Sequence, residues 1–253
     1  MGVVTEIDPT RARSFGDLAE AYDRARPGYP DEAVDWLVPP VARVVADVAA
    51  GTGKLTGSLL ARGLVVEAVE PDGAMLAVLR TRHPLARLHQ APAERLPLAT
   101  AGVDAVLVAQ AWHWLRPYDA TNEVRRVLRG GGSLGLVWNT PDPRSAWEFA
   151  AHGLDPAAWV PPRVAVPDDD LPFPTGEVQT AEFAWTWTVT AEEWVAAVAT
   201  QSAVSTLPAP EREALLAERR AVVLGRIEAT NAPTVRLRHR AMCLRWTPGV
   251  DAS

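Results

Sequence analysis

VVADVAAGTGKLTGSLLARGLVVEAVE, residues 44 to 70, is the stretch that decides the fold. Residues 44–48 are apolar apart from one Asp, which predicts a buried strand, and residues 65–69, apolar apart from one Glu, predict a second strand. A glycine-containing turn, 49–53, separates the first strand from a helix expected over 54–62. Strand, helix and strand in this order form the unit from which parallel sheets are built.

The turn and the strand ends carry the residues expected to bind a ligand. Gly51 and Gly53 lack a Cβ, so a ligand can lie against their backbone. Glu70 follows the second strand, where a carboxylate can accept both hydroxyls of a ribose, and Asp47 adds a second carboxylate beneath the turn. The pattern therefore predicts a site for a nucleotide-like molecule at the carboxyl ends of these strands.

Three ligand classes could use such a unit. A phosphate-binding loop needs Gly where this chain has Val48 and Ser or Thr where it has Leu55, so ATP or GTP hydrolysis is not favoured. A dinucleotide fingerprint needs a small residue where Thr56 stands, which leaves NAD as the second choice. S-adenosylmethionine carries a ribose and an adenine without phosphate, and it suits two carboxylates around a turn whose nearest basic residue is Lys54.

Six segments, in this order, are spread over about half the chain: FGDLAEAYDRARPGYP (Phe15 to Pro30), DVAAGTGKLT (Asp47 to Thr56), EPDGAML (Glu70 to Leu76), APAERLPL (Ala91 to Leu98), AQAWHWL (Ala109 to Leu115) and VWN (Val137 to Asn139). Through them the chain resembles class I S-adenosylmethionine-dependent methyltransferases, most closely the small-molecule branch that includes trans-aconitate methyltransferase-like proteins. The resemblance implies S-adenosyl-L-methionine as cofactor, S-adenosyl-L-homocysteine as product, and methyl transfer to an O or N atom of a small molecule, a carboxylate or a secondary metabolite.

Position 49 departs from the pattern of this family, which usually has Gly where this chain has Ala49. If the turn needs a positive φ at this position, Ala costs on the order of 1 kcal/mol. We expect cofactor binding to survive, because Gly51 and Gly53 are intact.

Alternation of strands and helices predicts an α/β fold, and the resemblance makes it a Rossmann-like methyltransferase sheet of seven strands, mostly parallel with the last antiparallel, with helices on both faces. We expect one domain, 1–253, with an N-terminal helical lid (1–40), a cofactor-binding core (41–140), an insertion after the fifth strand (141–176) and C-terminal strands and helices (177–247). The insertion either covers the active site or is a plain surface loop. Beyond residue 70 the expected helices are Asp72–Arg80, Tyr118–Leu128, Ala191–Thr206 and Glu211–Thr230, and the expected strands are Ala86–Gln90, Val103–Ala109, Ser133–Trp138 (after a turn at Gly130–Gly132), Val178–Val189 and Val235–Trp246.

The resemblance also implies a set of cofactor-binding residues: Tyr22, Arg26, Asp47, Ala49, Gly51, Gly53, Glu70, Pro71, Met75, Ala93, Glu94 and Gln110. Arg26 would clamp the methionine carboxylate and Tyr22 would close over the sulfonium, although Arg26 could instead cap its own helix. Ala93 and Glu94 would hold the adenine edge, against a surface salt bridge for Glu94. Met75 would pack on the ribose or adenine, against a role as core filler.

Aromatic residues are expected around the acceptor. Trp112, Trp114, Trp138 and Asn139 follow or end the fourth and fifth strands and form the expected substrate pocket. His113 is the candidate general base, against a histidine that only fixes its loop by hydrogen bonding.

Composition fits a compact enzyme with 48% hydrophobic and 22% charged residues. A single cysteine and five histidines without an HExxH pairing predict no metal site. A net charge of −6 with scattered arginines predicts no nucleic-acid partner, and the lack of a long apolar run predicts no membrane span and a cytoplasmic location. We expect a monomer or weak homodimer. The alternative to a methyltransferase is a protein of the same fold that binds S-adenosylmethionine for a non-methylating rearrangement or for binding alone.

Overall fold

The computed structural model describes residues 23, 25–142, 144–155 and 176–249. The elements, in chain order, are α3 (Asp31–Leu37), β1 (Val44–Val48), α4 (Lys54–Leu60), β2 (Val65–Val69), α5 (Gly73–Arg82), β3 (Arg87–His89), β4 (Val103–Ala109), η2 (Trp112–Trp114), α6 (Pro117–Val127), β5 (Leu128–Pro141), α7 (Ala146–His152), β6 (Gly176–Val189), α8 (Ala191–Ala199), α9 (Ser202–Ser205), α10 (Ala209–Thr230) and β7 (Val235–Pro248). Within this part of the chain, no helix is both long and apolar enough to cross a membrane.

The strands form one 7-stranded sheet in the order β3-β2-β1-β4-β5-β7-β6. Neighbours among β1 to β5 pair in parallel, whereas β7 is antiparallel to both β5 and β6. The last strand therefore runs opposite to the others, which confirms the predicted fold class. The strand order reverses between β1 and β4, and open α/β sheets bind ligands at the carboxyl ends of strands at such a point.

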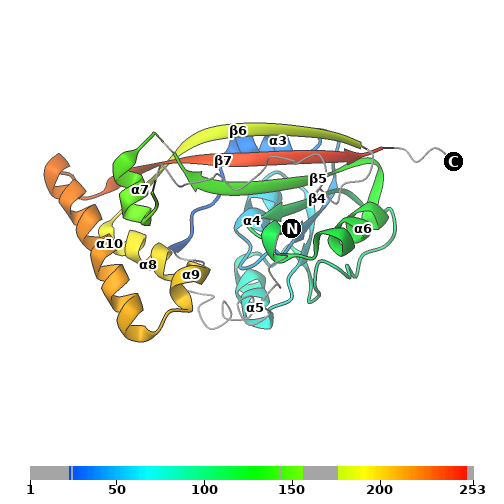
Figure 1. Cartoon of the computed structure of the whole chain (residues 1–253). Helices are drawn as coiled ribbons and strands as arrows, with labels where there is room; N and C mark the ends of the chain where they lie inside the picture. The colour runs from blue at the N-terminus through cyan, green and yellow to red at the C-terminus, as the bar shows by residue number, and fades with distance from the viewer. Residues whose placement is uncertain (1–22, 24, 143, 156–175, 250–253) are drawn as a thin grey trace, which may run out of the picture.

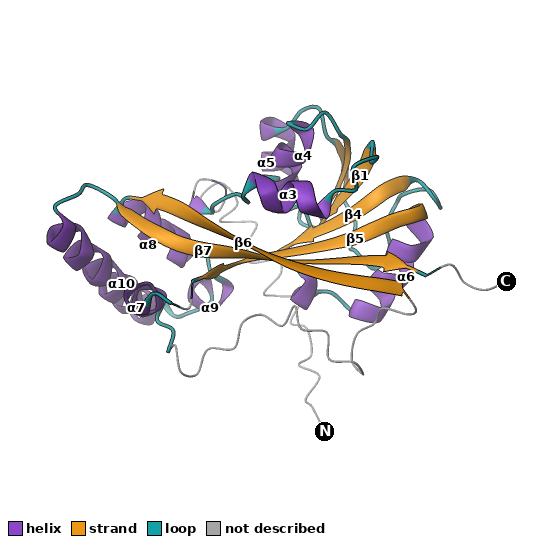
Figure 2. Ribbon diagram, turned by 90° about the horizontal axis from the view of Figure 1, so that it is seen from above, coloured by secondary structure: helices purple, strands orange, loops and turns teal. Residues whose placement is uncertain are grey.

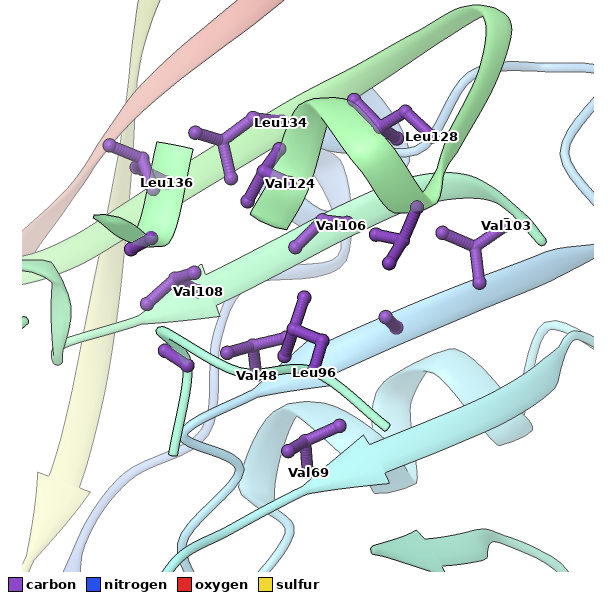
Figure 3. Close-up of a cluster of buried hydrophobic side chains, with 14 of the residues drawn as sticks. Val48, Val69, Leu96, Val103, Val106, Val108, Val124, Leu128, Leu134 and Leu136 are labelled. Atoms are coloured by element: carbon purple, nitrogen blue, oxygen red, sulfur yellow. The ribbon is translucent and has the colours of Figure 1, made fainter. Parts of the chain in front are cut away.

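Helices cover both faces of the sheet (Figure 2). On one face, α3 and α4 pack against the sheet through a buried cluster that includes Leu37 and Leu59. On the other face, α6 contributes Val124 to a second cluster with Val106 and Leu136, and these side chains interdigitate in Figure 3. Because both faces of β4 are buried, its sequence VDAVLVA is almost continuously apolar rather than alternating.

The strands β6 and β7 are long and carry a separate group of helices. They pair over their whole length, from Gly176 and Pro248 to Val189 and Val235. Pairing of β5 with β7 ends at Pro141, so the ribbon beyond that point has two strands. Helices α7, α8, α9 and α10 gather at this end, away from α4, α5 and α6 (Figure 1). We call them the helical lobe; it has its own buried cluster, which includes Trp194, Val223 and Leu237.

The predicted turn at Gly130–Gly132 lies inside β5 rather than before it. Val103 of β4 pairs with Leu128, and Ala105 pairs with Ser133. The intervening residues of β5 therefore bulge out of the ladder, and the central glycine has a φ of +80°. The glycines do turn the chain, but the pairing on both sides makes the segment part of one strand.

The predicted helix Ala191–Thr206 is wrong as a single helix, because it divides into α8 and α9. The hydroxyl of Thr200 donates to the carbonyl of Ala197 (2.7 Å), and Gln201 is extended with ψ 136°. A threonine that bonds back to the preceding turn competes with helix continuation.

Two predicted segments lie mostly outside the described residues. The lid is described only from Asp23 and Ala25 onward, and helix ends there before Pro27. Of the insertion, residues 141–142, 144–155 and 176 are described, and the sequence pattern missed α7 there.

Candidate functional site

The glycine turn after β1 contains three residues in the left-handed region: Ala49 (φ +55°), Gly51 (φ +57°) and Gly53 (φ +92°). Position 49 therefore does require a positive φ, and the alanine there costs on the order of 1 kcal/mol. Contacts around the turn therefore hold Ala49 in this conformation despite its cost.

Glu70 fixes the turn from the end of β2. Its Oε2 accepts from the backbone N–H of Gly51 and its Oε1 from that of Asp72, both at 2.9 Å. Burial raises the pKa of Glu70 to about 7, and only 6% of the residue is exposed. Each carboxylate oxygen keeps a second lone pair, so Glu70 can hold the turn and still accept hydroxyl donors from a ligand.

Asp47, the second carboxylate, lies beneath the turn and is 1% exposed. Its Oδ2 accepts from the hydroxyl of Thr56 (2.5 Å), while its Oδ1 is buried with no hydrogen-bond partner in the described residues. Burial raises the pKa of Asp47 to about 7. A buried acceptor without a donor is costly, and a bound ligand with a donor group would remove that cost.

The two glycines of the turn serve different neighbours. A Cβ at Gly51 would meet only Met75 Sδ, at 3.7 Å, so space remains beside this backbone. A Cβ at Gly53 would stand 2.7 Å from the ring of His83, and one at Gly57 would stand 2.6 Å from the same ring. His83 thus occupies the space next to Gly53, and Gly51 is the position that offers its backbone to a ligand.

The single lysine is engaged with the N-terminal segment. Lys54 Nζ lies 3.8 Å from Asp23 Oδ1, and Arg82 pairs with Asp23 Oδ2 at 2.8 Å. Burial lowers the pKa of Lys54. A lysine held in this way is poorly suited to bind phosphate, which agrees with a ligand that carries none.

The residues expected at the adenine end take different positions. Ala93 is 5% exposed and belongs to the buried cluster on the α6 face of the sheet, which we call the α6-side core. Glu94 Oε1 accepts from the backbone N–H of Arg116 (2.8 Å) and so satisfies the amino end of α6. Pro71 is exposed, and its carbonyl accepts from Gln90 Nε2 (3.2 Å).

Gln110, just after β4, meets Asn139 of β5 beyond the point where these two strands stop pairing. Gln110 has a φ of +60°, and its side-chain amide donates to the carbonyl of Asn139 (3.4 Å). Asn139 Nδ2 donates to the carbonyl of Gly28 (2.9 Å), while Asn139 Oδ1 is buried and finds no donor among the described residues. Strain at Gln110 and an unsatisfied acceptor at Asn139 are typical of a ligand site.

The aromatic residues predicted for the acceptor divide into two groups. Trp112 and Trp114 are half-buried on η2, and His113 between them is exposed with its ring centroid 4.8 Å from that of Trp114. Neighbouring atoms that exclude water from its ring lower the pKa of His113. Trp138 is 7% exposed in the α6-side core, so it has little surface left for an acceptor.

Arg26 points toward the helical lobe. Its Nε donates to the hydroxyl of Thr200 at the end of α8 (2.9 Å). The predicted clamp on a methionine carboxylate is a different contact, which stays a prediction. Tyr22 lies outside the described residues.

A pair of histidines, His152 of α7 and His239 of β7, is buried where the helical lobe meets the β6–β7 ribbon. Burial lowers the pKa of His152 to about 3 and that of His239 to about 4. The ring centroid of His152 lies 4.5 Å from that of Trp194 and 5.9 Å from that of His239, and that of Trp185 lies 5.2 Å from that of His239. Both histidines are therefore neutral near pH 7.

Sequence reasoning missed Thr56, which orients Asp47, and His83, which covers the turn. The spacing of Gly53 and Gly57 on one face of α4 is a signal that could have indicated close approach by a bulky group. The described residues contain no group of three or more His, Cys, Asp or Glu side chains placed to hold a metal.

Comparison with known proteins agrees with this geometry. Residues 46–136 match the family described as "Methyltransferase domain". An uncharacterized methyltransferase of Mycobacterium tuberculosis is 44% identical over 239 residues, which cover 92% of this chain and 95% of the relative.

Solved structures give the same result for the fold. A candidate type II methyltransferase of Anaeromyxobacter dehalogenans superposes with a TM-score of 0.63 at 29% identity, covering 88% of this chain and 97% of the other. A candidate methyltransferase from an antibiotic biosynthesis pathway of Anabaena variabilis gives 0.56 at 23% identity, covering 86% and 96%, and supports the fold alone. With the strand order, the strained turn and the two buried carboxylates, these similarities identify the chain as a member of the class I S-adenosylmethionine-dependent methyltransferases.

Proposed function

We propose that the protein transfers the methyl group of S-adenosylmethionine to an O or N atom of a small-molecule acceptor, a carboxylate or a secondary metabolite. The observation that carries the proposal is the pair Asp47 and Glu70 around the open backbone of Gly51. Both carboxylates are buried, and Asp47 keeps an unsatisfied oxygen. A ligand with hydroxyl donors and positive charge fits this set better than one with phosphates.

In this proposal the residues around the turn bind different parts of the cofactor. Glu70 accepts the two ribose hydroxyls while it holds the turn through Gly51, and Met75 packs beside them. Asp47 Oδ1 accepts from the methionine ammonium, directly or through a water. Ala93 bounds the adenine, with the backbone N–H of Glu94 at its edge, since the Glu94 carboxylate is bonded to Arg116.

The cofactor supplies an electrophilic methyl group, so the protein must hold the acceptor atom in line with it. Trp112 and Trp114, which lie just beyond β4, are the aromatic walls against which we place a flat acceptor. A carboxylate acceptor arrives ionised and needs no base, whereas an amine or alcohol must lose a proton. His113 is exposed, and its lowered pKa keeps it neutral near pH 7, in the form that can accept that proton.

Two experiments test the proposal in sequence. Calorimetric titration with S-adenosylmethionine, S-adenosylhomocysteine and NAD should give micromolar binding of the first two and none of the third. Incubation with S-adenosylmethionine and a panel of carboxylic acids, phenols and amines should then release S-adenosylhomocysteine together with a product heavier by one methyl group. Binding without any S-adenosylhomocysteine across the panel would favour the non-methylating alternative, and binding of NAD alone would overturn the assignment of the cofactor.

Glu70→Gln should weaken binding of S-adenosylmethionine and of S-adenosylhomocysteine, and it should slow the formation of S-adenosylhomocysteine from S-adenosylmethionine. Glu67→Gln is the matched control, because Glu67 lies on β2, the strand that Glu70 follows, but pairs with Arg87 and His89, both at 2.8 Å. Equal losses in the two variants would contradict a specific role for Glu70.

We also expect a single-domain monomer or weak homodimer, which light scattering of the purified protein measures.

Arg26 has two candidate partners, and a pair of variants separates them. If Arg26 clamps the methionine carboxylate, Arg26→Ala weakens cofactor binding at least about tenfold, since it removes charge-assisted hydrogen bonds. Thr200→Val removes only the hydroxyl that Arg26 contacts in this structure and should leave the affinity nearly unchanged. An unchanged dissociation constant for Arg26→Ala would discard the clamp.

A further inference from the structure

The helical lobe contains a cavity of about 520 Å³, apart from the glycine turn. Cavities that bind small molecules have volumes of about 300–1,000 Å³. Figure 1 places α7 and α10 at one end of the molecule, away from α4 and α5. The lining residues are Trp147, Glu148, Thr186, Arg226, Thr230, Ala232, Thr234, Val235, Arg236 and Arg238.

The strand register explains why polar residues gather in this cavity. Beyond Pro141 the sheet consists only of β6 and β7, and Thr186 is the direct partner of Arg238. Arg236 lies two residues from Arg238 on β7, so both side chains project from the same face of the ribbon. Helix α7 lies beside this section, and the end of α10 supplies Arg226.

One arginine of the cavity is already neutralised. Glu148 is 1% exposed, and its Oε2 accepts from the backbone N–H of Arg238 (3.0 Å). Its Oε1 lies 3.5 Å from Arg238 Nε. This carboxylate therefore pairs with Arg238 in the lining of the cavity.

The other two arginines have no carboxylate in contact among the residues that the structure describes. Arg226 stacks over Trp147, with its guanidinium carbon 5.2 Å from the ring centroid, and Arg236 is exposed. Elsewhere in the protein, arginines such as Arg62 and Arg126 are tied to carboxylates. The carboxyl end of α10 adds some negative potential, but two unneutralised guanidiniums exceed the partial charge of one helix end.

We propose that this cavity binds a small molecule bearing a phosphate or carboxylate group, through Arg226 and Arg236, independently of the cofactor. The planar guanidiniums donate paired hydrogen bonds to an oxyanion, and the hydroxyls of Thr186 and Thr234 add donors at the same cavity. Trp147 stiffens the Arg226 side chain by stacking, so less rotamer freedom is lost on binding.

Calorimetry of the full chain at an ionic strength of about 0.15 M tests this proposal with inorganic phosphate, pyrophosphate and citrate as separate probes. We expect saturable binding at one site for at least one probe. Arg236→Gln should weaken it at least about tenfold, and Arg226→Gln/Arg236→Gln about a hundredfold, because each removes a charge-assisted contact. Binding of phosphate or pyrophosphate alone indicates a phosphorylated ligand, and binding of citrate alone a carboxylate.

Arg43→Gln is the control, since Arg43 is exposed at the amino end of β1 and its loss changes the net charge equally. It should leave the affinity within about twofold, because screening removes distant charges. Equal weakening by Arg43→Gln and Arg236→Gln would reduce the effect to general attraction and overturn the proposal. So would the absence of saturable binding to all three probes. Affinity for S-adenosylhomocysteine should be unaltered in Arg236→Gln, and a tenfold loss would contradict the independence of the two sites.

Discussion

The carboxyl edge of the sheet and the helical lobe both bury titratable groups, but of opposite kind. At the edge, burial raises the pKa of Asp47 and of Glu70 to about 7. In the lobe, burial lowers the pKa of His152 and His239 to about 3 and about 4. The cause is the same in both regions, because a low-dielectric surrounding disfavours whichever form is charged.

Both regions contain a buried polar atom with no partner among the described residues, Asp47 Oδ1 at the edge and His152 Nε2 in the lobe, but they differ in what surrounds it. The edge keeps the acceptor Asp47 Oδ1 beside an open glycine backbone, whereas the lobe surrounds its histidines with aromatic rings. Acceptors beside open backbone suit a ligand with donors and positive charge, and aromatic packing suits a structural core. Perturbed pKa values and unsatisfied atoms therefore do not identify the site by themselves, and the open space beside Gly51 is what separates the two cases.

The largest expected effect is at the edge. Glu70→Ala removes the acceptor of both ribose hydroxyls and the anchor of Gly51, so affinity for S-adenosylhomocysteine should fall about a hundredfold. Calorimetry measures the change, and circular dichroism checks that the variant is folded. A dissociation constant within about threefold of the unmodified protein would remove the main difference between the two regions.

The next effect is in the lobe. His239 has a folded-state pKa of about 4 against an ordinary value of 6.5, so the unfolded chain binds the proton first as the pH falls. Its contribution to stability is complete above pH 6.5 and is lost as the pH falls toward 4, about 2 kcal/mol by pH 5. Asp47 and Glu70 act in the opposite sense, since raised pKa values favour the folded state in acid.

A variant must therefore isolate the histidine. Urea unfolding at pH 7.5 and pH 5 measures the free energy of unfolding of His239→Phe and of the unmodified protein. Between these pH values the unmodified protein should lose about 2 kcal/mol more than the variant. Trp185→Phe, beside His239 but without a titratable group, should show a difference that does not depend on pH. A constant difference for His239→Phe would mean that the histidine is not held neutral by burial.

At the edge of the sheet, much of the local structure could be predicted from the sequence. The bounds of β1, β2 and β4 agree with the apolar runs, because each strand is specified by its own residues and buried on both faces. The contacts of Glu70 with Gly51 and Asp72 also lie within one short segment.

Contacts between distant segments could not be predicted in this way. Arg26 meets Thr200, Glu94 meets Arg116, and His83 covers Gly53 only after the chain has folded. The histidine pair of the lobe likewise depends on the pairing of β7 with β5 and β6. Periodicity within a segment carries no information about such partners.

A smaller effect concerns the ionisation of Glu70 at the carboxyl edge of the sheet. Because Glu70 must be ionised to accept hydroxyl donors at full strength, and its pKa is about 7, affinity for S-adenosylhomocysteine should rise about tenfold from pH 6 to pH 8. In Glu70→Gln only the titration of Asp47 and of the ligand remains, so the rise should be smaller. Identical pH dependence in the two proteins would show that Glu70 is already ionised at pH 6.

The smallest effect distinguishes strain kept for function from strain that is merely tolerated. Ala49 has a φ of +55°, which costs on the order of 1 kcal/mol for alanine and little for glycine. Ala49→Gly should therefore raise the free energy of unfolding by about that amount, less the entropy that glycine gains in the unfolded chain. Ala50→Gly, at the next residue without a positive φ, incurs the entropy cost alone and should destabilise. If Ala49→Gly also destabilised the protein, contacts of the alanine methyl would stabilise the fold by more than the positive φ costs. Position 49 would then be a packing site rather than a strained one.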